Sequence, residues 1–174
     1  MPNFDNRIYV GTDLGKVSGV VTSLPAGYVL GEERWEALKK YRLVFNAGGA
    51  SGAIGNVMAS VGSTGPYSVT VTTASDSNHH VNAVVVANST ATTGSFFWGL
   101  VQGRTALTTG NTSAATGQAI FISAAGVVVP FSALTITTTL NNYPIGMCLG
   151  AATQVTGMTG LSNVLGGDYR INLG

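Results

Sequence analysis

The chain has 174 residues and few charged side chains, eight Lys or Arg against seven Asp or Glu, for a net charge of +1. Charged residues make up 9% of the sequence, against about 25% in an ordinary globular domain, while a hydrophobic content of 45% excludes intrinsic disorder. The near-zero net charge argues against a nucleic-acid-binding protein, and the apolar stretches are shorter than the roughly 18–20 residues of a membrane-spanning helix.

The charges are unevenly distributed along the chain. Eleven of them fall within residues 1–42, and between Leu43 and Gly167 only Asp76 and Arg104 are charged. Surface charge normally keeps proteins apart in solution. We therefore expect a contact-making first part and a nearly neutral body that partners cover in places.

The first part is predicted to be an N-terminal arm followed by a helix. Residues 1–30 hold short apolar pieces separated by Gly, Ser and Pro, which predicts an extended arm with little core of its own. These residues lack the basic and then apolar pattern of a secretory signal. In residues 32–41, EERWEALKKY, the side chains Trp35, Leu38 and Tyr41 recur every third residue, with acids early and lysines late. This pattern predicts one short helix.

Residues 31–174 are predicted to form one β-rich domain. Residues 67–73, YSVTVTT, alternate apolar and polar side chains, as half-buried antiparallel strands do. Further strands are expected at residues 41–46, 81–87, 95–102, 118–123, 134–138, 145–149 and 169–173. Helix at residues 53–61 is the less favoured alternative. This number of short strands predicts an all-β fold, either a β-sandwich or a small β-barrel.

The strand at residues 95–102 is apolar on both faces, with Phe96, Trp98 and Leu100 on one side. One interpretation is a central strand covered by the rest of the fold. The other is that one face meets another subunit, since aromatic anchors are enriched at interfaces. These three residues are therefore candidates for core or inter-subunit packing, and the neighbouring charge Arg104 is a candidate interface residue.

No group of residues in the sequence makes a convincing catalytic or metal site. The glycine-rich residues 48–55 lack the Lys-Ser/Thr ending of a phosphate-binding loop. On a strand, His79 and His80 would point to opposite faces, and only Asp76 lies near them in sequence. Cys148 is expected to be a buried structural thiol. The sequence therefore predicts a protein that is not an enzyme and needs neither a cofactor nor a metal.

Five segments follow one another in a distinctive order of glycine turns and strands. They are LGEERWEALKKYRLVFNAG at residues 30–48, GSFFWGLVQG at 94–103, TGQAI at 116–120, PIGMCLGAA at 144–152 and YRINL at 169–173. This order resembles the small capsid decoration proteins of tailed bacteriophages. The resemblance covers residues 30–174 and implies a β-rich, tulip-like fold without catalytic residues.

The resemblance also implies a function and partners. Such a protein would be part of the virion, bound as a homotrimer to the major capsid protein at local three-fold positions on the outer surface of the head, without contact to nucleic acid or membrane. The charged segment at residues 1–42 would dock to the shell. The candidate capsid-contact residues are Arg7, Lys16, Arg34, Lys39 and Lys40.

Two alternatives remain open from the sequence. One is another head or tail structural component. The other is a carbohydrate-binding β-sandwich that attaches particles to glycans, for which Tyr67 and Trp98 are candidates for an exposed aromatic platform.

Overall fold

The computed structural model describes residues 13–61, 64–71, 83–109, 114–122, 127–130, 144–150 and 164–173. These residues form a short 3-10 helix, η1 (Asp13–Gly15), and eleven strands. The strands are β1 (Val20–Val21), β2 (Glu33–Glu36), β3 (Lys39–Asn46), β4 (Val57–Ser60), β5 (Ser68–Val71), β6 (Ala83–Ala87), β7 (Phe96–Thr109), β8 (Ala119–Ile122), β9 (Val128–Pro130), β10 (Gly146–Gly150) and β11 (Val164–Asn172). The prediction of an all-β fold is confirmed.

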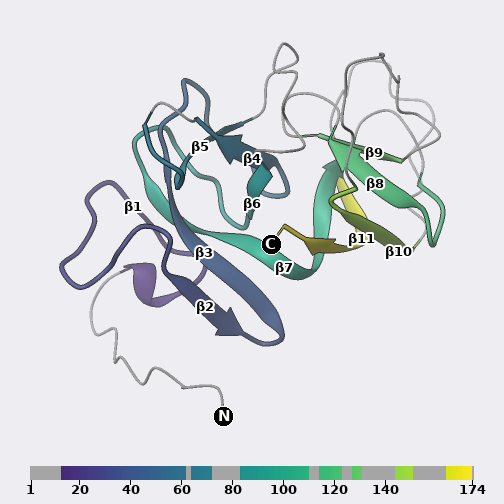
Figure 1. Ribbon diagram of the computed structural model, residues 1–174, viewed down its shortest axis with the longest axis horizontal. Coiled ribbons are helices and arrows are strands. Elements are labelled where there is room, and N and C mark those ends of the chain that lie inside the picture. The colour runs from purple at the N-terminus through teal and green to yellow at the C-terminus, as the bar shows by residue number, and fades with distance from the viewer. Residues whose placement is uncertain are drawn as a thin grey trace.

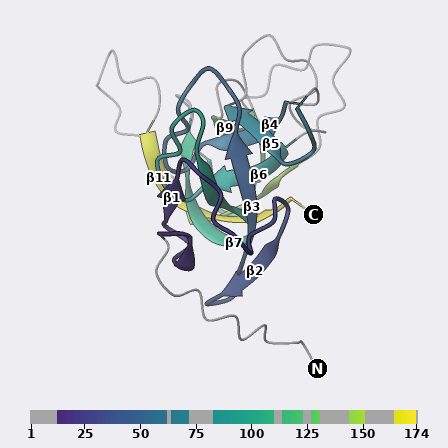
Figure 2. The same cartoon turned by 90° about the vertical axis from the view of Figure 1, so that its left-hand side faces the viewer.

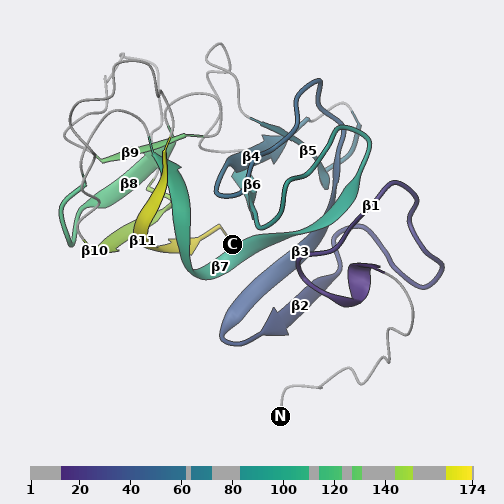
Figure 3. The same cartoon turned by 180° about the vertical axis from the view of Figure 1, so that it is seen from behind.

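The strands form two closed rings that share the long strand β7. From β7 the pairings run through β6, β4, β5 and β3 back to β7, and separately through β9, β8, β10 and β11 back to β7. The β3–β5 and β7–β9 pairs are parallel and the others are antiparallel. Figures 1 and 3 show the two rings side by side, with β7 passing from one to the other.

Strand β7 extends well beyond the predicted residues 95–102 because it serves both rings. Its first half pairs with β3, up to Gln102, and its second half pairs with β11, from Gln102 to Thr109. Gly103 lies at the junction with a φ of +136°, a backbone conformation that side chains with a Cβ rarely adopt. A glycine therefore allows the strand to leave one ring and enter the other.

The core consists of two clusters of buried apolar side chains, one on each face of the first half of β7. Phe97 and Val101 pack with side chains from β3, β4, β5 and β6, among them Val85, inside the first ring. Trp98 and Leu100 point the other way, into a cluster that continues into the second ring. Both faces of the strand are thus covered within the chain, which accounts for its apolar character on both sides.

The described part of the predicted arm, residues 13–30, packs on the sheet. Strand β1 pairs with β7, and Leu14 and Tyr28 are buried in the cluster that contains Trp98. Tyr28 meets the Trp98 ring edge-on, with the ring centroids 6.5 Å apart. These residues therefore belong to the core, although the sequence predicted little core for them. They cover the face of β7 that would otherwise expose Trp98.

The predicted helix at residues 32–41 is wrong, because these residues form the β2–β3 hairpin. Isolated helices of this length are marginal in water and depend on tertiary packing of one face. The spacing of three does not produce such a face here, since Tyr41 is buried while Trp35 is 62% and Leu38 is 92% exposed. Strand β3 instead gains hydrogen-bonded neighbours on both sides, from β2 and from β7.

The other predicted strands coincide in position with described ones, except that residues 134–138 lie outside the described residues. Residues 57–60 are strand β4, so the helical alternative for this region is also wrong.

Candidate functional site

The β2–β3 hairpin extends from the two rings, next to η1 (Figures 1 and 2). Its strands pair from Glu33 opposite Arg42 to Glu36 opposite Lys39. Since successive side chains of a strand point to opposite faces, Arg34 and Glu36 share one face while Glu33 and Trp35 share the other. The two faces have different roles.

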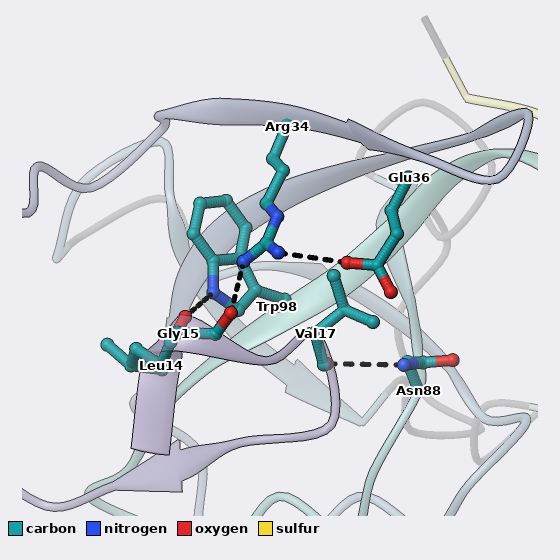
Figure 4. A network of polar contacts seen from close by, with 7 residues as sticks. All are labelled: Leu14, Gly15, Val17, Arg34, Glu36, Asn88 and Trp98. Carbon is teal, nitrogen blue, oxygen red and sulfur yellow. Dashed lines mark hydrogen bonds and ion pairs between the residues drawn. The ribbon is translucent and has the colours of Figure 1, made fainter. Parts of the chain in front are cut away.

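The first face holds the N-terminal segment against the sheet (Figure 4). Arg34 donates a hydrogen bond of 2.8 Å to the carbonyl oxygen of Gly15 and forms an ion pair of 2.9 Å with Glu36. Its guanidinium carbon lies 5.9 Å from the centroid of the Trp98 ring, within cation–π range. The Trp98 indole N–H donates to the carbonyl oxygen of Leu14 at 2.9 Å.

A third contact completes this attachment. The side-chain amide of Asn88 donates to the carbonyl oxygen of Val17 at 3.2 Å. Three backbone carbonyls of the N-terminal segment are thus bound by side chains from β2, β7 and the loop after β6. The segment and the base of the hairpin are thereby fixed relative to each other.

The second face carries an ion-pair cluster centred on Glu33. Its carboxylate lies 2.8 Å from the Lys40 ammonium and 2.7 Å from the Arg42 guanidinium. Burial acts to raise the pKa of Glu33, but the hydrogen bonds and charges of the two cations outweigh it and hold the pKa below its ordinary value. The Arg42 guanidinium also lies 6.0 Å from the centroid of the Tyr67 ring. The base of the hairpin is therefore braced on both faces.

The tip of the hairpin is a two-residue turn formed by Ala37 and Leu38. Both have positive φ, 48° and 67°, the pattern of a type I′ turn, which strongly favours Asn and Gly. Leu38 is 92% exposed at this tip, and Trp35 beside it on β2 is 62% exposed. The hairpin therefore presents two large apolar side chains to solvent on a charged and internally braced support.

The predicted capsid-contact residues differ in their contacts and in their exposure. Arg34 and Lys40 are engaged in the intramolecular contacts described above. Lys39 is half-buried next to the turn, and Lys16 is exposed after η1. Arg7 lies outside the described residues.

The four candidates for core or interface packing all lie on β7, and their side chains differ in exposure. Trp98 and Leu100 are fully buried core residues. Phe96 is half-buried and packs against Phe45, with ring centroids 4.7 Å apart. Arg104 is exposed on β7, opposite Arg170 of β11.

The sequence pattern assigns Trp35 and Leu38 to the core face of a helix, whereas the structure exposes both. Their exposure follows from the pairing of β3 with β7, a strand that lies far along the chain from the hairpin. The sequence contains one local signal for a strand in this region. Tyr41 and Leu43, two residues apart, are both buried, as expected for one face of a strand.

The groups considered for catalysis or metal binding do not come together in the described part of the chain. No cluster of three or more His, Cys, Asp or Glu side chains occurs within it. Cys148 is fully buried, with its sulfur 2.9 Å from the carbonyl oxygen of Gly150. Asp76, His79 and His80 lie outside the described residues.

Comparisons of the chain with protein-family models, curated proteins and solved structures gave no significant match. Among the described residues, no helix has the length and apolar character needed to cross a membrane. The candidate site is therefore defined by its own geometry, and the β2–β3 hairpin is its most distinctive element.

Proposed function

We propose that this protein is a virion structural protein that binds the outer surface of an icosahedral bacteriophage head. In this proposal it cements neighbouring subunits of the major capsid protein, acts as a homotrimer and has no catalytic role. The order of segments that resembles capsid decoration proteins supports the proposal, as does the all-β fold.

The observation that carries the proposal is the position of the charged side chains on the fold. In the described residues six of them lie on the β2–β3 hairpin, Glu32 directly precedes it, and Asp13 and Lys16 lie in and directly after η1. The hairpin and η1 lie together at one end of the molecule in Figure 2. The remaining described strands carry only Arg104, Asp168 and Arg170. A charged, braced end on a nearly neutral β body suits a protein that contacts a large assembly at that end.

The mechanism of stabilisation would be mass action. A protein that binds the assembled shell, but not its dissociated subunits, favours assembly in proportion to its affinity and concentration. Three linked copies on neighbouring capsid subunits would add avidity, because after the first contact the others form at high effective concentration.

The experiment is to mix the purified protein with undecorated phage heads and image the particles by electron cryomicroscopy. We expect added density at symmetry-related positions on the outer surface and a solution mass near three times 17.7 kDa. Bare shells at saturating protein would refute the proposal.

Two N-terminal deletions test which residues contribute to head binding. Deleting residues 1–12 leaves Leu14 and Tyr28 in the core, whereas deleting residues 1–30 would remove both. If residues 1–12 contribute to docking, the shorter deletion weakens head binding, and its melting temperature shows whether the body remains folded. If the variant without residues 1–12 binds heads as tightly as the wild type, the docking residues lie in the remaining chain.

Glycan binding is the second candidate function, and one observation favours it. Trp98, a candidate for the aromatic platform, is buried, and Tyr67 packs against Gly31, but Trp35 is 62% exposed beside charged side chains. An exposed Trp of this kind can stack on a sugar ring. A glycan array with the wild-type protein and a Trp35→Thr variant tests this function separately from head binding.

A further inference from the structure

Two of the large exposed apolar side chains lie three residues apart on the β2–β3 hairpin, one on β2 and one in the turn. Trp35 and Leu38 are 62% and 92% exposed. Trp is among the residue types that most often provide the affinity in protein interfaces, and an exposed Leu side chain gains free energy when a partner buries it. The hairpin extends from the body, so a partner can reach both side chains without rearrangement of the core (Figure 1).

The backbone of the turn adds a second, independent observation. Ala37 and Leu38 both adopt positive φ, which is unfavourable for residues with a Cβ. Leu38 gains almost no packing within the chain in return, since it is nearly fully exposed. Its burial by a partner would offset the unfavourable turn.

The charged side chains of the hairpin indicate which charges border the apolar surface of the partner. The hairpin, residues 33–46, has four cations, Arg34, Lys39, Lys40 and Arg42, against the two anions Glu33 and Glu36. The anions are already paired with Arg34, Lys40 and Arg42. The excess positive charge is complementary to carboxylates.

We propose that Trp35 and Leu38 insert into an apolar pocket bordered by carboxylates on the outer face of the capsid shell. This inference rests on the proposed function and specifies the docking element and its receptor. The ion pairs and hydrogen bonds at the base fix the backbone of the hairpin that carries Trp35 and Leu38, which limits the backbone entropy lost on binding.

Co-sedimentation with undecorated heads tests the docking element. The Trp35→Thr/Leu38→Ala double variant retains a strand-forming residue in β2 and the Cβ in the turn, so its circular dichroism and melting temperature should match the wild type. We expect its affinity for heads to fall about 100-fold or more, as the loss of two buried anchors requires. The matched control, Met147→Thr, removes an apolar side chain that is 41% exposed on β10 and should bind like the wild type.

Charge reversal tests the border of the pocket. Lys39→Glu should weaken head binding by about tenfold, and added salt should weaken the wild type more than this variant, because salt screens attraction between opposite charges. If Lys39→Glu binds as tightly as the wild type at low salt, the acidic border is refuted.

The outcomes distinguish this inference from the proposed function. If the wild type binds heads and the folded double variant binds equally well, the docking element is wrong and the decoration function stands. If the wild type fails to bind heads, the decoration function fails, and the docking proposal fails with it. Loss of glycan binding by Trp35→Thr would then assign the exposed Trp to sugar recognition.

Discussion

Replacing Leu38 with glycine is expected to stabilise the free protein. Leu38 has a φ of +67° and is 92% exposed. The substitution therefore removes the steric conflict of a Cβ at positive φ without removing any buried contact. Most substitutions of a large apolar residue by glycine destabilise a protein, so the expected sign is specific to this turn.

The expected magnitude follows from two opposing terms. A left-handed backbone costs a residue with a Cβ about 1–2 kcal/mol, and glycine costs about 0.5–1 kcal/mol through its greater freedom in the unfolded chain. The difference is a stabilisation of about 0.5–1 kcal/mol. For a chain of this length, 1 kcal/mol corresponds to about 2–4 °C in melting temperature. We expect an increase of about 1–4 °C.

Thermal and urea denaturation, followed by circular dichroism and tryptophan fluorescence, measure this difference. Leu38→Ala keeps the Cβ and should lie within about 0.5 kcal/mol of the wild type. Gly27, with a φ of +93° and open space around it, provides the opposite control, because Gly27→Ala should destabilise by about 1 kcal/mol. A Leu38→Gly protein less stable than the wild type would refute the strain at the turn.

Three other substitutions test the core and the ion pairs. Gly99→Ala should destabilise the protein by about 2 kcal/mol in urea denaturation, because the added Cβ would overlap the Val85 side chain. Tyr169→Phe should stabilise by about 1 kcal/mol at pH 7, since the buried hydroxyl has no hydrogen-bond partner among the described residues. Burial, and then the Coulombic effect of the neighbouring Cys148, raise the pKa of Tyr169 to about 12. The folded wild type should therefore lose stability between pH 10 and 12, and the Phe variant should lose less. Glu33→Gln should destabilise the protein at pH 7, where the carboxylate is paired, and destabilise it less at pH 3, below the ordinary pKa of 4.5.

The sign of the Glu33 effect follows from its lowered pKa. The ion pairs stabilise the folded protein above the ordinary value of 4.5, and this contribution is lost as the pH falls through the lower folded value. An equal difference between the two proteins at pH 7 and pH 3 would contradict this account. For the core, Gly49→Ala is the control, because no atom lies within 4 Å of the added Cβ. A neutral Gly99→Ala, or a destabilising Tyr169→Phe, would contradict the packing described for those sites.

The period-two alternation of residues 67–73 and the spaced Gly and Asn turns were sufficient to predict an all-β fold from the sequence. The alternation and the turn residues are local signals. A strand with one buried and one exposed face shows the alternation whichever strand it pairs with. The burial of Cys148 was also predictable, because its apolar neighbours in sequence indicate a covered strand.

The hairpin at residues 33–46 was not predictable in this way. The sequence EERWEALKKY has charge and apolar spacing suited to a helix, and its actual conformation is set by pairing between β3 and β7. The exposure of Trp35 and Leu38, and thus the candidate site, depends on that long-range pairing. The same holds for Arg34, whose partners Gly15 and Trp98 both lie far from it along the chain, on opposite sides in sequence.

The sequence by itself determined the class of fold and the separation of a charged first part from a nearly neutral body. Composition belongs to the whole sequence, and alternation belongs to residues that are adjacent in it. Neither depends on how the strands are arranged in space. Only the tertiary structure decided that β7 belongs to two rings, that residues 13–30 cover Trp98, and that Trp35 and Leu38 face solvent. Each of these depends on which distant strands meet, because burial is set by neighbours in space.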